Sequence, residues 1–464
     1  MEAIGARAPQ PASETPSEGL LSPRLRVLTI GLILVVTLAA FEALAVATAM
    51  PVVEEDLSGL RLYGLVFAGF MVGNLVGTGY AGLEADRREP VRPFTVGIIV
   101  FAAGLLIGGL APTMEVVVLA RIVQGFGSGC IATVAYVGIA RGYDETLRPR
   151  MFAVLSSAWV VPGLIGPAMA GAIAEHLTWR LVFIGLLPAL AFSAVLTVPA
   201  MRHLAAGDHR TADGKRLGQS LVLAVGAGFV LGGTTIQAPF AAGPMVVIGL
   251  GVGFFALRTL LPKGTFVAAP GLPAAVAVMG LICLAFFGTE AFLPLMLNDV
   301  RGQSPTIAGL CLTAASITWT AGAWVQAQRA TRWSRRAMVM VGFLLTAAGI
   351  GISTSTVSDS VPVPAAAVGW GVAGFGMGLA YTNISLAILG GLPGDQAGYA
   401  SSSLQLANII GVAVGTGVCG AIVGAGDAAD WSTANTVAIS FGLMGAAALV
   451  ATAVAVRLPD AASA

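Results

Sequence analysis

Two charged side chains of opposite sign lie inside long apolar stretches of the sequence. Arg121 falls within an apolar run from about residue 116 to 140, and Glu42 within a run from about 27 to 50. A guanidinium keeps its proton, and an unpaired charge in hydrocarbon costs several kcal/mol or more. Arg121 must therefore face a protein interior or a wet cavity and find an anionic partner. Glu42 lies at a suitable depth to be that partner.

We interpret Glu42 and Arg121 as a proton-coupling pair. Both residues fall in the expected outer half of their spans, so an approach between the two helices is geometrically possible. Burial disfavours a charged carboxylate and a neighbouring guanidinium favours it, so Glu42 could change its charge near working pH. A permanent structural ion pair, or a Glu in a wet vestibule, is the alternative that the residues leave open.

A third intramembrane charge, Glu290, belongs to the second half of the chain. It could be a second protonation site or an anionic contact for a cationic substrate. Because its apolar run ends near residue 297, it could equally be a helix-end residue exposed to the outer solvent.

Six polar residues on otherwise apolar helices form a further set of candidates. Together they indicate a cavity with scattered polar groups and apolar walls, although each could instead make an interhelical hydrogen bond. The six are Asn74, Gln124, Tyr136, Asn383, Gln405 and Asn408.

Apolar stretches dominate the whole chain. Of its 464 residues, 56% are hydrophobic and only 10% are charged, and the mean hydropathy is +0.88. Soluble domains carry about 25% charged residues, so we expect an all-α integral membrane protein. Fourteen runs are long enough to cross a bilayer as helices. They lie near 27–50, 62–84, 93–112, 116–140, 151–174, 181–201, 218–236, 243–261, 272–297, 304–328, 337–356, 362–389, 399–424 and 434–456.

The basic residues provide an independent test of this count. With fourteen spans, nearly all of the 24 Lys and Arg residues fall in cytoplasmic segments, and the outer loops hold only Arg61, Arg180 and Arg301. This bias follows the positive-inside rule and predicts that both termini are cytoplasmic. Removing one span would invert every later loop, so the pattern requires an even number.

The spans divide into two related halves. The charged loop after the second span has a counterpart after the tenth, and the fifth and thirteenth spans are both rich in glycine. Repeated halves around a central site are typical of secondary transporters. The expected organisation is a cytoplasmic tail (1–26), a six-helix bundle (27–201), a cytoplasmic linker (202–217), two inserted helices (218–261), a second six-helix bundle (272–457) and a tail (458–464).

The sequence offers no catalytic set. Its three His residues lie in or beside loops, its four Cys lack metal-ligand spacing, and neither Lys lies in a phosphate-binding loop. An intramembrane enzyme or a non-transporting sensor is therefore the remote alternative. We expect no cofactor, no metal and, without a basic patch, no nucleic acid partner.

The segment around Arg121 carries the pattern Arg-x-x-Gln-Gly-x-Gly, formed by Arg121, Gln124, Gly125 and Gly127. Glu42 is followed nine residues later by Pro51. These patterns resemble the helix-4 and first-helix signatures of the major facilitator superfamily, specifically of its fourteen-helix drug:proton antiporter branch, with Glu in place of Asp. The Thr and Asn of the first-helix signature are missing. The resemblance covers about residues 25–457 and implies two pseudo-symmetric six-helix bundles plus two extra helices.

Two further signatures of that family match in part. The loop signature between the second and third spans matches at Gly82, Asp86 and Arg87 but departs at Glu84, Glu89 and Pro90. The exporter signature of the fifth span matches at Gly166, Pro167 and Gly171, whereas Pro162 and Ala170 replace glycines.

These motif residues are the candidates for conformational roles. Asp86, Arg87 and Arg88, which follow Gly82 in the same loop, are expected to latch the two halves on the cytoplasmic side, or else are solvated loop charges that set topology. Gly125 and Gly127 would let neighbouring helices approach closely. Pro162, Gly166, Pro167 and Gly171 are assigned to kinking and close packing of the fifth span.

The resemblance implies a proton-coupled exporter, an antiporter of amphipathic, cationic or neutral lipophilic small molecules that works by alternating access. A carrier of a lipid or metabolite on the same fold, by export or proton symport, is the alternative. The expected partners are a small lipophilic substrate, protons and membrane lipids, with the proton gradient as the energy source. We expect a monomer in the bacterial cytoplasmic (inner) membrane.

Overall fold

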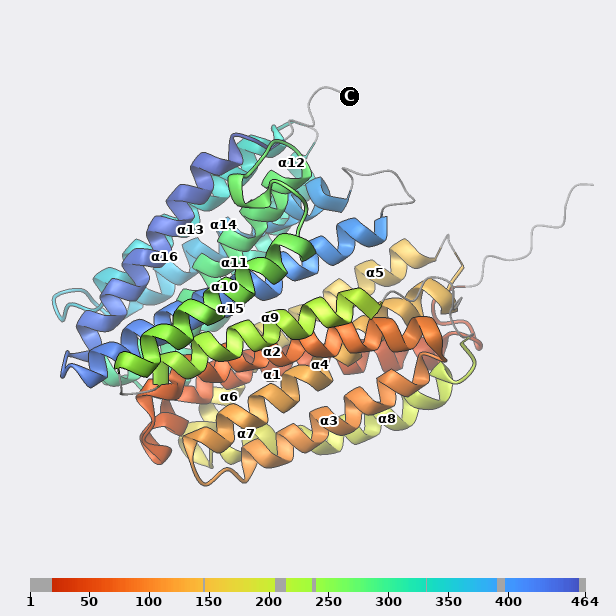
Figure 1. Cartoon of the computed structure of the whole chain (residues 1–464), viewed down its shortest axis with the longest axis horizontal. Helices are drawn as coiled ribbons and strands as arrows, with labels where there is room; N and C mark the ends of the chain where they lie inside the picture. The colour runs from red at the N-terminus through yellow and green to blue at the C-terminus, as the bar shows by residue number, and fades with distance from the viewer. Residues whose placement is uncertain are drawn as a thin grey trace, which may run out of the picture.

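The computed structural model describes residues 19–144, 147–204, 214–235, 239–330, 332–389 and 397–458, where its regular elements are all helical. Figure 1 shows two bundles of long helices that meet toward one end and diverge toward the other. The first bundle contains α1 (Arg26–Leu57), the short η1 (Leu60–Leu62), α2 (Tyr63–Arg87), α3 (Val91–Gly109), α4 (Met114–Gly142), α5 (Arg148–Ser157), α6 (Val160–His176), α7 (Arg180–Ile184) and α8 (Leu187–Met201).

The second bundle follows two helices that lie between the bundles in sequence, α9 (Gly214–Thr235) and α10 (Pro239–Leu260), and the short η3 (Thr265–Val267). It contains α11 (Leu272–Leu295), the π-helical turn η4 (Met296–Val300), α12 (Pro305–Arg329), α13 (Arg335–Ser355), α14 (Pro364–Leu389), α15 (Ala397–Ala428) and α16 (Thr433–Ala455). Most of the expected linker (205–213), the start of the first tail (1–18) and residues 459–464 lie outside the described residues.

Twelve helices of the described part are long and apolar enough to cross a membrane. The chain is therefore a multi-pass, all-helical membrane protein. The two expected spans that do not reach this length and hydropathy are those at 151–174 and 218–236. Among the described residues, the apolar part of α9 covers only Leu217–Val230.

The span expected at 151–174 is divided into α5 and α6. Pro162 has no N–H, so it cannot donate to the carbonyl of Ala158, four residues earlier. The chain turns at residues 158–159, and the helical ladder resumes where the Gly163 N–H donates to the Trp159 carbonyl at 3.0 Å. Pro162 thus divides the apolar run into two helices, although the hydropathy is continuous along the run.

The two described ends of the chain, Gly19 and Leu458, define what we call the N/C side of the bundle, and the opposite side is the far side. Because successive spans alternate in direction, α2, α4 and α12 end on the N/C side (Figure 1). The connections α1–α2, α11–α12 and α15–α16 lie on the far side.

The two bundles are joined on the far side. Arg61, before α2, forms an ion pair with Asp427 at the end of α15, with Nε and Oδ2 2.9 Å apart. The Tyr63 hydroxyl donates to the Ala291 carbonyl at 3.2 Å, and a Glu175 carboxylate oxygen accepts from the Thr306 N–H at 3.2 Å. The structure is therefore closed on the far side.

Glycines set the closest approaches between these helices. A Cβ at Gly64 would overlap the backbone of Gly420, so α2 and α15 are in backbone contact. On α6 and α12, a Cβ at Gly171 would overlap the Pro305 carbonyl, and one at Gly309 would overlap the Pro167 carbonyl. Small residues at such crossings let helix backbones pack directly on each other.

The inserted helices α9 and α10 pack against each other and lie beside α2 and α15 (Figure 1). Their own contact is also close, because a Cβ at Gly226 would lie 2.7 Å from the backbone nitrogen of Gly253. Leu223 and Ala256 form a small hydrophobic cluster with Leu75 of α2, and Ile409 of α15 packs against it. The pair therefore contacts both bundles.

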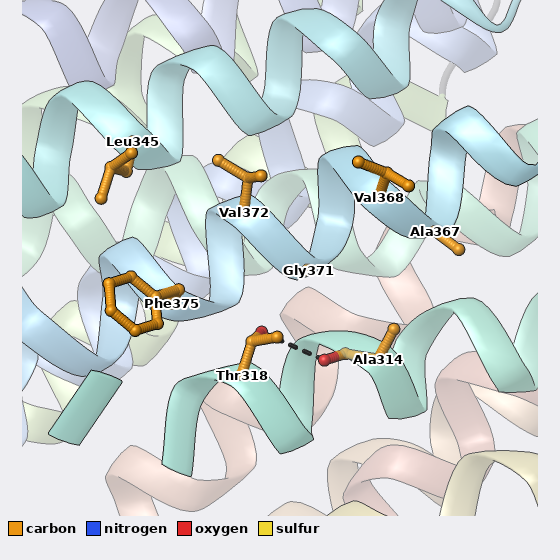
Figure 2. A pocket seen from close by; sticks show the side chains of 8 residues that line it. All are labelled: Ala314, Thr318, Leu345, Ala367, Val368, Gly371, Val372 and Phe375. Carbon is orange, nitrogen blue, oxygen red and sulfur yellow. Dashed lines mark hydrogen bonds between the residues drawn. The ribbon is translucent and has the colours of Figure 1, made fainter. Parts of the chain in front are cut away.

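A groove of about 450 Å³ opens between α12, α13 and α14 (Figure 2). Its polar residue, Thr318, donates to the carbonyls of Ala314 and Ala315 within α12, at 3.0 and 3.1 Å. None of the six polar candidates lines it, so it is not the cavity that they indicate. The lining residues are Ala314, Thr318, Leu345, Ala367, Val368, Gly371, Val372 and Phe375.

The alternating glycines of α4 face two different neighbours. A Cβ at Gly125 would overlap the Phe70 carbonyl and one at Gly129 would overlap the Asn74 carbonyl, both on α2. A Cβ at Gly127 would instead lie 2.5 Å from the Phe101 nitrogen on α3. The close approach expected at Gly125 and Gly127 is thus present, and it brings α2 against the segment that carries Arg121.

We predict that Gly125→Ala destabilises the protein, because the added methyl group overlaps backbone that cannot move without displacing α2. Overpacking of this kind costs about 1–3 kcal/mol. Gly351→Ala in α13 is the matched control, because no atom lies within 4 Å of its added Cβ. Thermal unfolding in detergent can be followed with a thiol-reactive dye, since all four Cys are buried. Equal unfolding midpoints for both variants would contradict the prediction.

Candidate functional site

Arg121 of α4 and Glu42 of α1 form a buried ion pair. The Arg121 Nη1 group donates to the Glu42 carboxylate, and the two side chains are 3% and 0% exposed. The same Nη1 donates to the Gln124 side-chain oxygen at 2.7 Å, one helical turn along α4. The spacing in the Arg-x-x-Gln pattern allows this hydrogen bond, because residues three apart on a helix lie on the same face.

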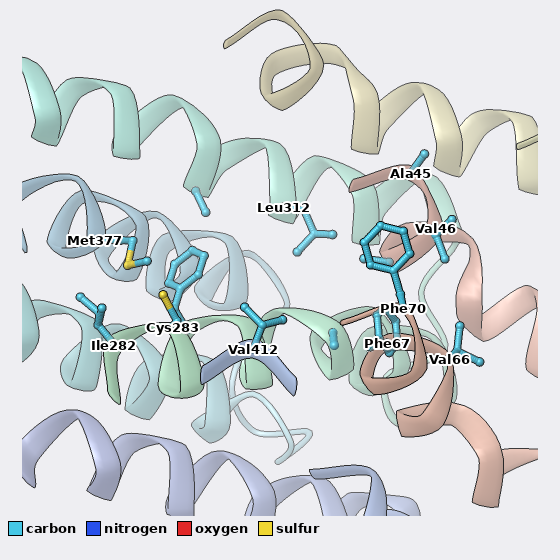
Figure 3. Packing of buried hydrophobic residues seen from close by; sticks show 14 of the residues in the cluster. Ala45, Val46, Val66, Phe67, Phe70, Ile282, Cys283, Leu312, Met377 and Val412 are labelled. Atoms are coloured by element: carbon cyan, nitrogen blue, oxygen red, sulfur yellow. The ribbon is translucent and has the colours of Figure 1, made fainter. Parts of the chain in front are cut away.

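Helix α2 completes the surroundings of the guanidinium. Arg121 Nε donates to the Val66 carbonyl at 3.4 Å, and its Cζ lies 4.2 Å from the centre of the Phe70 ring, within the range of a cation–π interaction. Figure 3 shows Val66 and Phe70 near Ala45 of α1, within a continuous hydrophobic core that includes residues of both bundles. The charge is therefore held in an apolar, closely packed environment.

Two polar atoms of this site lack a protein partner. Glu42 Oε2 and Gln124 Nε2 are buried and make no hydrogen bond with any described residue. A buried polar atom without a partner costs about 1–3 kcal/mol and is itself a point at which a ligand or proton can bind. Glu42 can thus accept a proton on Oε2 while Oε1 keeps its contact with Arg121.

Glu290 is buried near the far-side end of α11. Its side chain is 8% exposed and makes no hydrogen bond or ion pair with the described residues. The next residue, Ala291, accepts the hydrogen bond from Tyr63, and the Phe292 ring lies 5.1 Å from the Tyr63 ring. The structure therefore places Glu290 beside the contact between the bundles rather than on an exposed helix end.

The six polar candidates lie on α2, α4, α14 and α15. Gln124 belongs to the ion pair, and Asn383 is buried where its side-chain oxygen accepts from Gln326 of α12 at 3.2 Å. Asn408 donates to the Tyr381 hydroxyl at 2.8 Å, which links α15 to α14. Asn74 on α2 and Gln405 on α15 are half-buried, and Tyr136 on α4 is 45% exposed.

Aromatic residues of the second bundle form a cluster that the sequence did not single out. The Trp319 ring lies 5.5 Å from Phe286, 6.3 Å from Phe287 and 5.6 Å from Tyr381. Phe286 also stacks on Trp370 at 4.7 Å. The sequence pattern does not reveal this cluster, because its rings come from three different helices, α11, α12 and α14.

The charged residues at the end of α2 pair within the first bundle. Asp86 lies 3.5 Å from Arg141 of α4, and Arg88 lies 3.2 Å from Glu84. Arg87 is exposed, and Gly82 has open space around its Cα.

The fifth-span motif lies at the contact between the bundles. The Pro167 carbonyl faces Gly309 of α12, and Gly171 faces Pro305 at the start of the same helix. Gly166 faces Phe41 of α1, where an added Cβ would lie 3.4 Å from the ring. Pro162 lies just after the break that precedes α6.

Comparison with known proteins identifies the family. A family model described as the Major Facilitator Superfamily matches residues 32–290, which is more than half of the chain. The chain belongs to the Major Facilitator Superfamily. Membership of this superfamily indicates a membrane transporter rather than an enzyme.

Several curated members of the superfamily are similar to this chain. The multidrug efflux pump SdrM of Staphylococcus aureus (strain N315) is 23% identical over 69% of this chain and 72% of its own length. The tetracenomycin C resistance and export protein of Streptomyces glaucescens is 26% identical over 92% and 82%. Multidrug resistance protein 3 of Bacillus subtilis (strain 168) is 22% identical over 86% and 79%.

Solved structures of the superfamily share the fold. The xylose transporter XylE from E. coli, in a partially occluded inward-open conformation, matches with a TM-score of 0.64 at 13% identity, over 96% of this chain and 100% of its own. A bacterial homologue of the human lysosomal transporter Spinster, in an inward-facing conformation, matches with a TM-score of 0.61 at 17% identity, over 93% and 96%.

We predict that Arg121→Met destabilises this superfamily member strongly, because it leaves the Glu42 carboxylate buried without a counter-charge. Breaking a buried ion pair from one side costs about 3–5 kcal/mol. The double variant Glu42→Gln/Arg121→Met should lose less than the sum of the two single variants. Glu115→Gln, an exposed carboxylate on the same helix, is the control. Additive losses in unfolding free energy would show that the two side chains do not interact.

Proposed function

We propose that this chain is a proton-coupled secondary exporter of amphipathic, cationic or neutral lipophilic small molecules. The observation that supports this most strongly is the buried Glu42–Arg121 pair, whose second carboxylate oxygen has no protein partner. A fixed guanidinium beside a carboxylate that can take up a proton is suited to coupling proton movement to a conformational change.

The proposed cycle is alternating access with antiport. Protonation of Glu42 from the outside weakens its hold on Arg121 and on a bound substrate, which then leaves outward. The empty carrier returns, releases the proton to the cytoplasm and binds substrate again. Glu290, buried and without a protein partner, serves as a second protonation site or as the anionic contact for a cation.

We further propose fourteen spans with both termini in the cytoplasm, because the distribution of Lys and Arg requires an even number and favours that orientation. In this topology α5 and α6 together form the fifth span and α9 the seventh. The far side then faces outward, so the structure corresponds to a state closed to the outside. Asp86, whose carboxylate pairs with Arg141 of α4, is proposed to take part in a cytoplasmic latch between the bundles.

The similarity to multidrug efflux pumps and to an export protein for a natural product supports outward transport. We propose that the protein acts as a monomer in the bacterial cytoplasmic membrane and uses the proton gradient without a cofactor. The alternative function is that of a lipid or metabolite carrier on the same fold. The transport experiment below distinguishes this alternative from drug export.

Proton coupling can be tested with purified protein in liposomes that carry an imposed pH gradient. We expect lipophilic cations to evoke proton flux, read from a fluorescent internal pH indicator, and we expect Glu42→Gln to abolish it because the amide cannot take up a proton. Glu290→Gln should reduce the flux if that residue is a second protonation site. Asp359→Asn is the control, because this side chain is 98% exposed.

Full proton-dependent efflux by Glu42→Gln would refute the assignment of Glu42. If no lipophilic cation moves protons with the unsubstituted protein, the drug-export proposal is wrong. Lipid and metabolite cargo would then be tested on the same liposomes.

Alternating access predicts that Gly420→Leu shifts the protein away from the far-side-closed state, because the new side chain would overlap α2 at Gly64. Spin labels at Thr113 and Asp359, exposed on far-side loops of the two bundles, report their separation by pulsed electron paramagnetic resonance. We expect a longer distance in the variant. Gly442→Leu, with no atom within 4 Å of its added Cβ, should leave the distance unchanged. Equal distances between the spin labels in Gly420→Leu and Gly442→Leu would contradict the proposed alternating access.

A further inference from the structure

The two bundles face each other along two seams, and the seams differ. One seam lies between α2 and α15 and the other between α6 and α12. Both are closed by glycine contacts toward the far side. Their difference lies toward the N/C side, where the bundles diverge (Figure 1).

The seam between α2 and α15 is filled by the inserted helices. The two helices touch at Gly64 and Gly420. Leu75 of α2 and Ile409 of α15 lie about eleven residues further toward the N/C side, which is roughly 16 Å along each helix. At this level, side chains of the inserted helices lie with them. Leu223 of α9 and Ala256 of α10 share their hydrophobic cluster.

Closer still to the N/C side, α9 continues along α2. A Cβ at Gly79 would lie 3.2 Å from the Ser220 hydroxyl oxygen and 3.4 Å from the Leu217 side chain. Residues of α9 therefore cover this seam from mid-height toward the N/C side.

Among the described residues, neither inserted helix covers the seam between α6 and α12. The glycine contacts end at Gly163, whose added Cβ would lie 3.1 Å from Ser316. One turn further toward the N/C side, Trp159 is 49% exposed and Thr320 is exposed as well. Helix α5, which continues the chain on that side, packs against α1, α4 and α6 of its own bundle.

Tyr136 shows what lies behind this opening. It is on α4 of the first bundle and is 45% exposed, although α4 is largely covered by α2 and α3. Its hydroxyl lies within electrostatic range of the Tyr381 hydroxyl on α14 of the second bundle. Tyr136 thus faces the space between the bundles.

We propose that the N/C-side part of the α6/α12 seam, bordered by Trp159 and Thr320, is the entrance through which amphipathic molecules with an alkyl or acyl portion pass from the adjoining lipid leaflet into the space between the bundles. The α9–α10 pair closes the opposite seam, so lateral entry is one-sided. This assignment rests on the proposed function, which identifies the entering molecules as transport substrates. An indole at the border suits such molecules, because it offers an apolar face and a polar N–H.

The test measures labelling of a cysteine placed between the bundles. Tyr136→Cys protein in liposomes is treated with a maleimide attached to an acyl chain, which stays in the lipid, or with a small water-soluble maleimide. The unsubstituted protein gives the background, since its four Cys are buried. We expect both reagents to label Cys at this position.

The entrance is then narrowed by Thr320→Trp in the same background. We expect labelling by the acyl-chain reagent to slow about tenfold, with little change for the water-soluble reagent. Gly228→Trp, on α9 with no atom within 4 Å of its added Cβ, is the control of equal size on an inserted helix and should change neither rate.

The proposal is overturned if Thr320→Trp leaves acyl-chain labelling as fast as before, if Gly228→Trp slows it equally, or if the cysteine reacts only with the water-soluble reagent. These rates do not depend on transport. Efflux of a lipophilic cation, measured on the same liposomes, tests the proposed function separately. If the protein admits the acyl-chain reagent but moves no cation, the proposed entrance stands and the export assignment is wrong.

Discussion

The charge of Arg121 cannot be removed, and much of the first bundle follows from holding it away from water. A guanidinium in an apolar environment needs both a counter-charge and acceptors for its N–H groups. Helix α1 supplies the Glu42 carboxylate, α4 supplies Gln124, and α2 supplies the Val66 carbonyl and the Phe70 ring. Three helices must therefore converge on one point. Since only Glu42 in this group can change its charge, a proton added there alters the balance that holds all three helices together.

The glycines determine how closely those helices can converge and how the two bundles meet. Within the first bundle, Gly125 and Gly129 let α2 rest on the α4 backbone, which is what brings Val66 and Phe70 to the guanidinium. Between the bundles, Gly64 and Gly420 make the same kind of contact. Contacts of this type consist mainly of dispersion between backbones. They can separate without leaving a charged group exposed to hydrocarbon, which suits an interface that opens in each cycle.

The sequence was sufficient to predict the membrane class and most of the long helices, because long apolar runs are a local property. The pairing of Glu42 with Arg121 was also predictable, since one unpaired charge demands the other. The break before α6 was missed because a hydropathy run does not register the N–H that Pro162 lacks. The link between Asn408 and Tyr381, and the partner of Asp86, could not be foreseen, because each depends on how helices far apart in sequence are placed side by side.

The inserted helices add a mechanical consequence. Helix α9 packs along α2 near Gly79, and α10 packs on α9 through Gly226 and Gly253, so these three helices form one closely packed stack. On the side of α15, the stack meets aliphatic side chains such as Ile409. In the proposed alternating-access cycle, rocking of the bundles would place the shear between α15 and this stack, at the hydrophobic cluster of Leu75, Leu223 and Ala256. In that motion, α9 and α10 would move together with the first bundle and slide along α15 of the second.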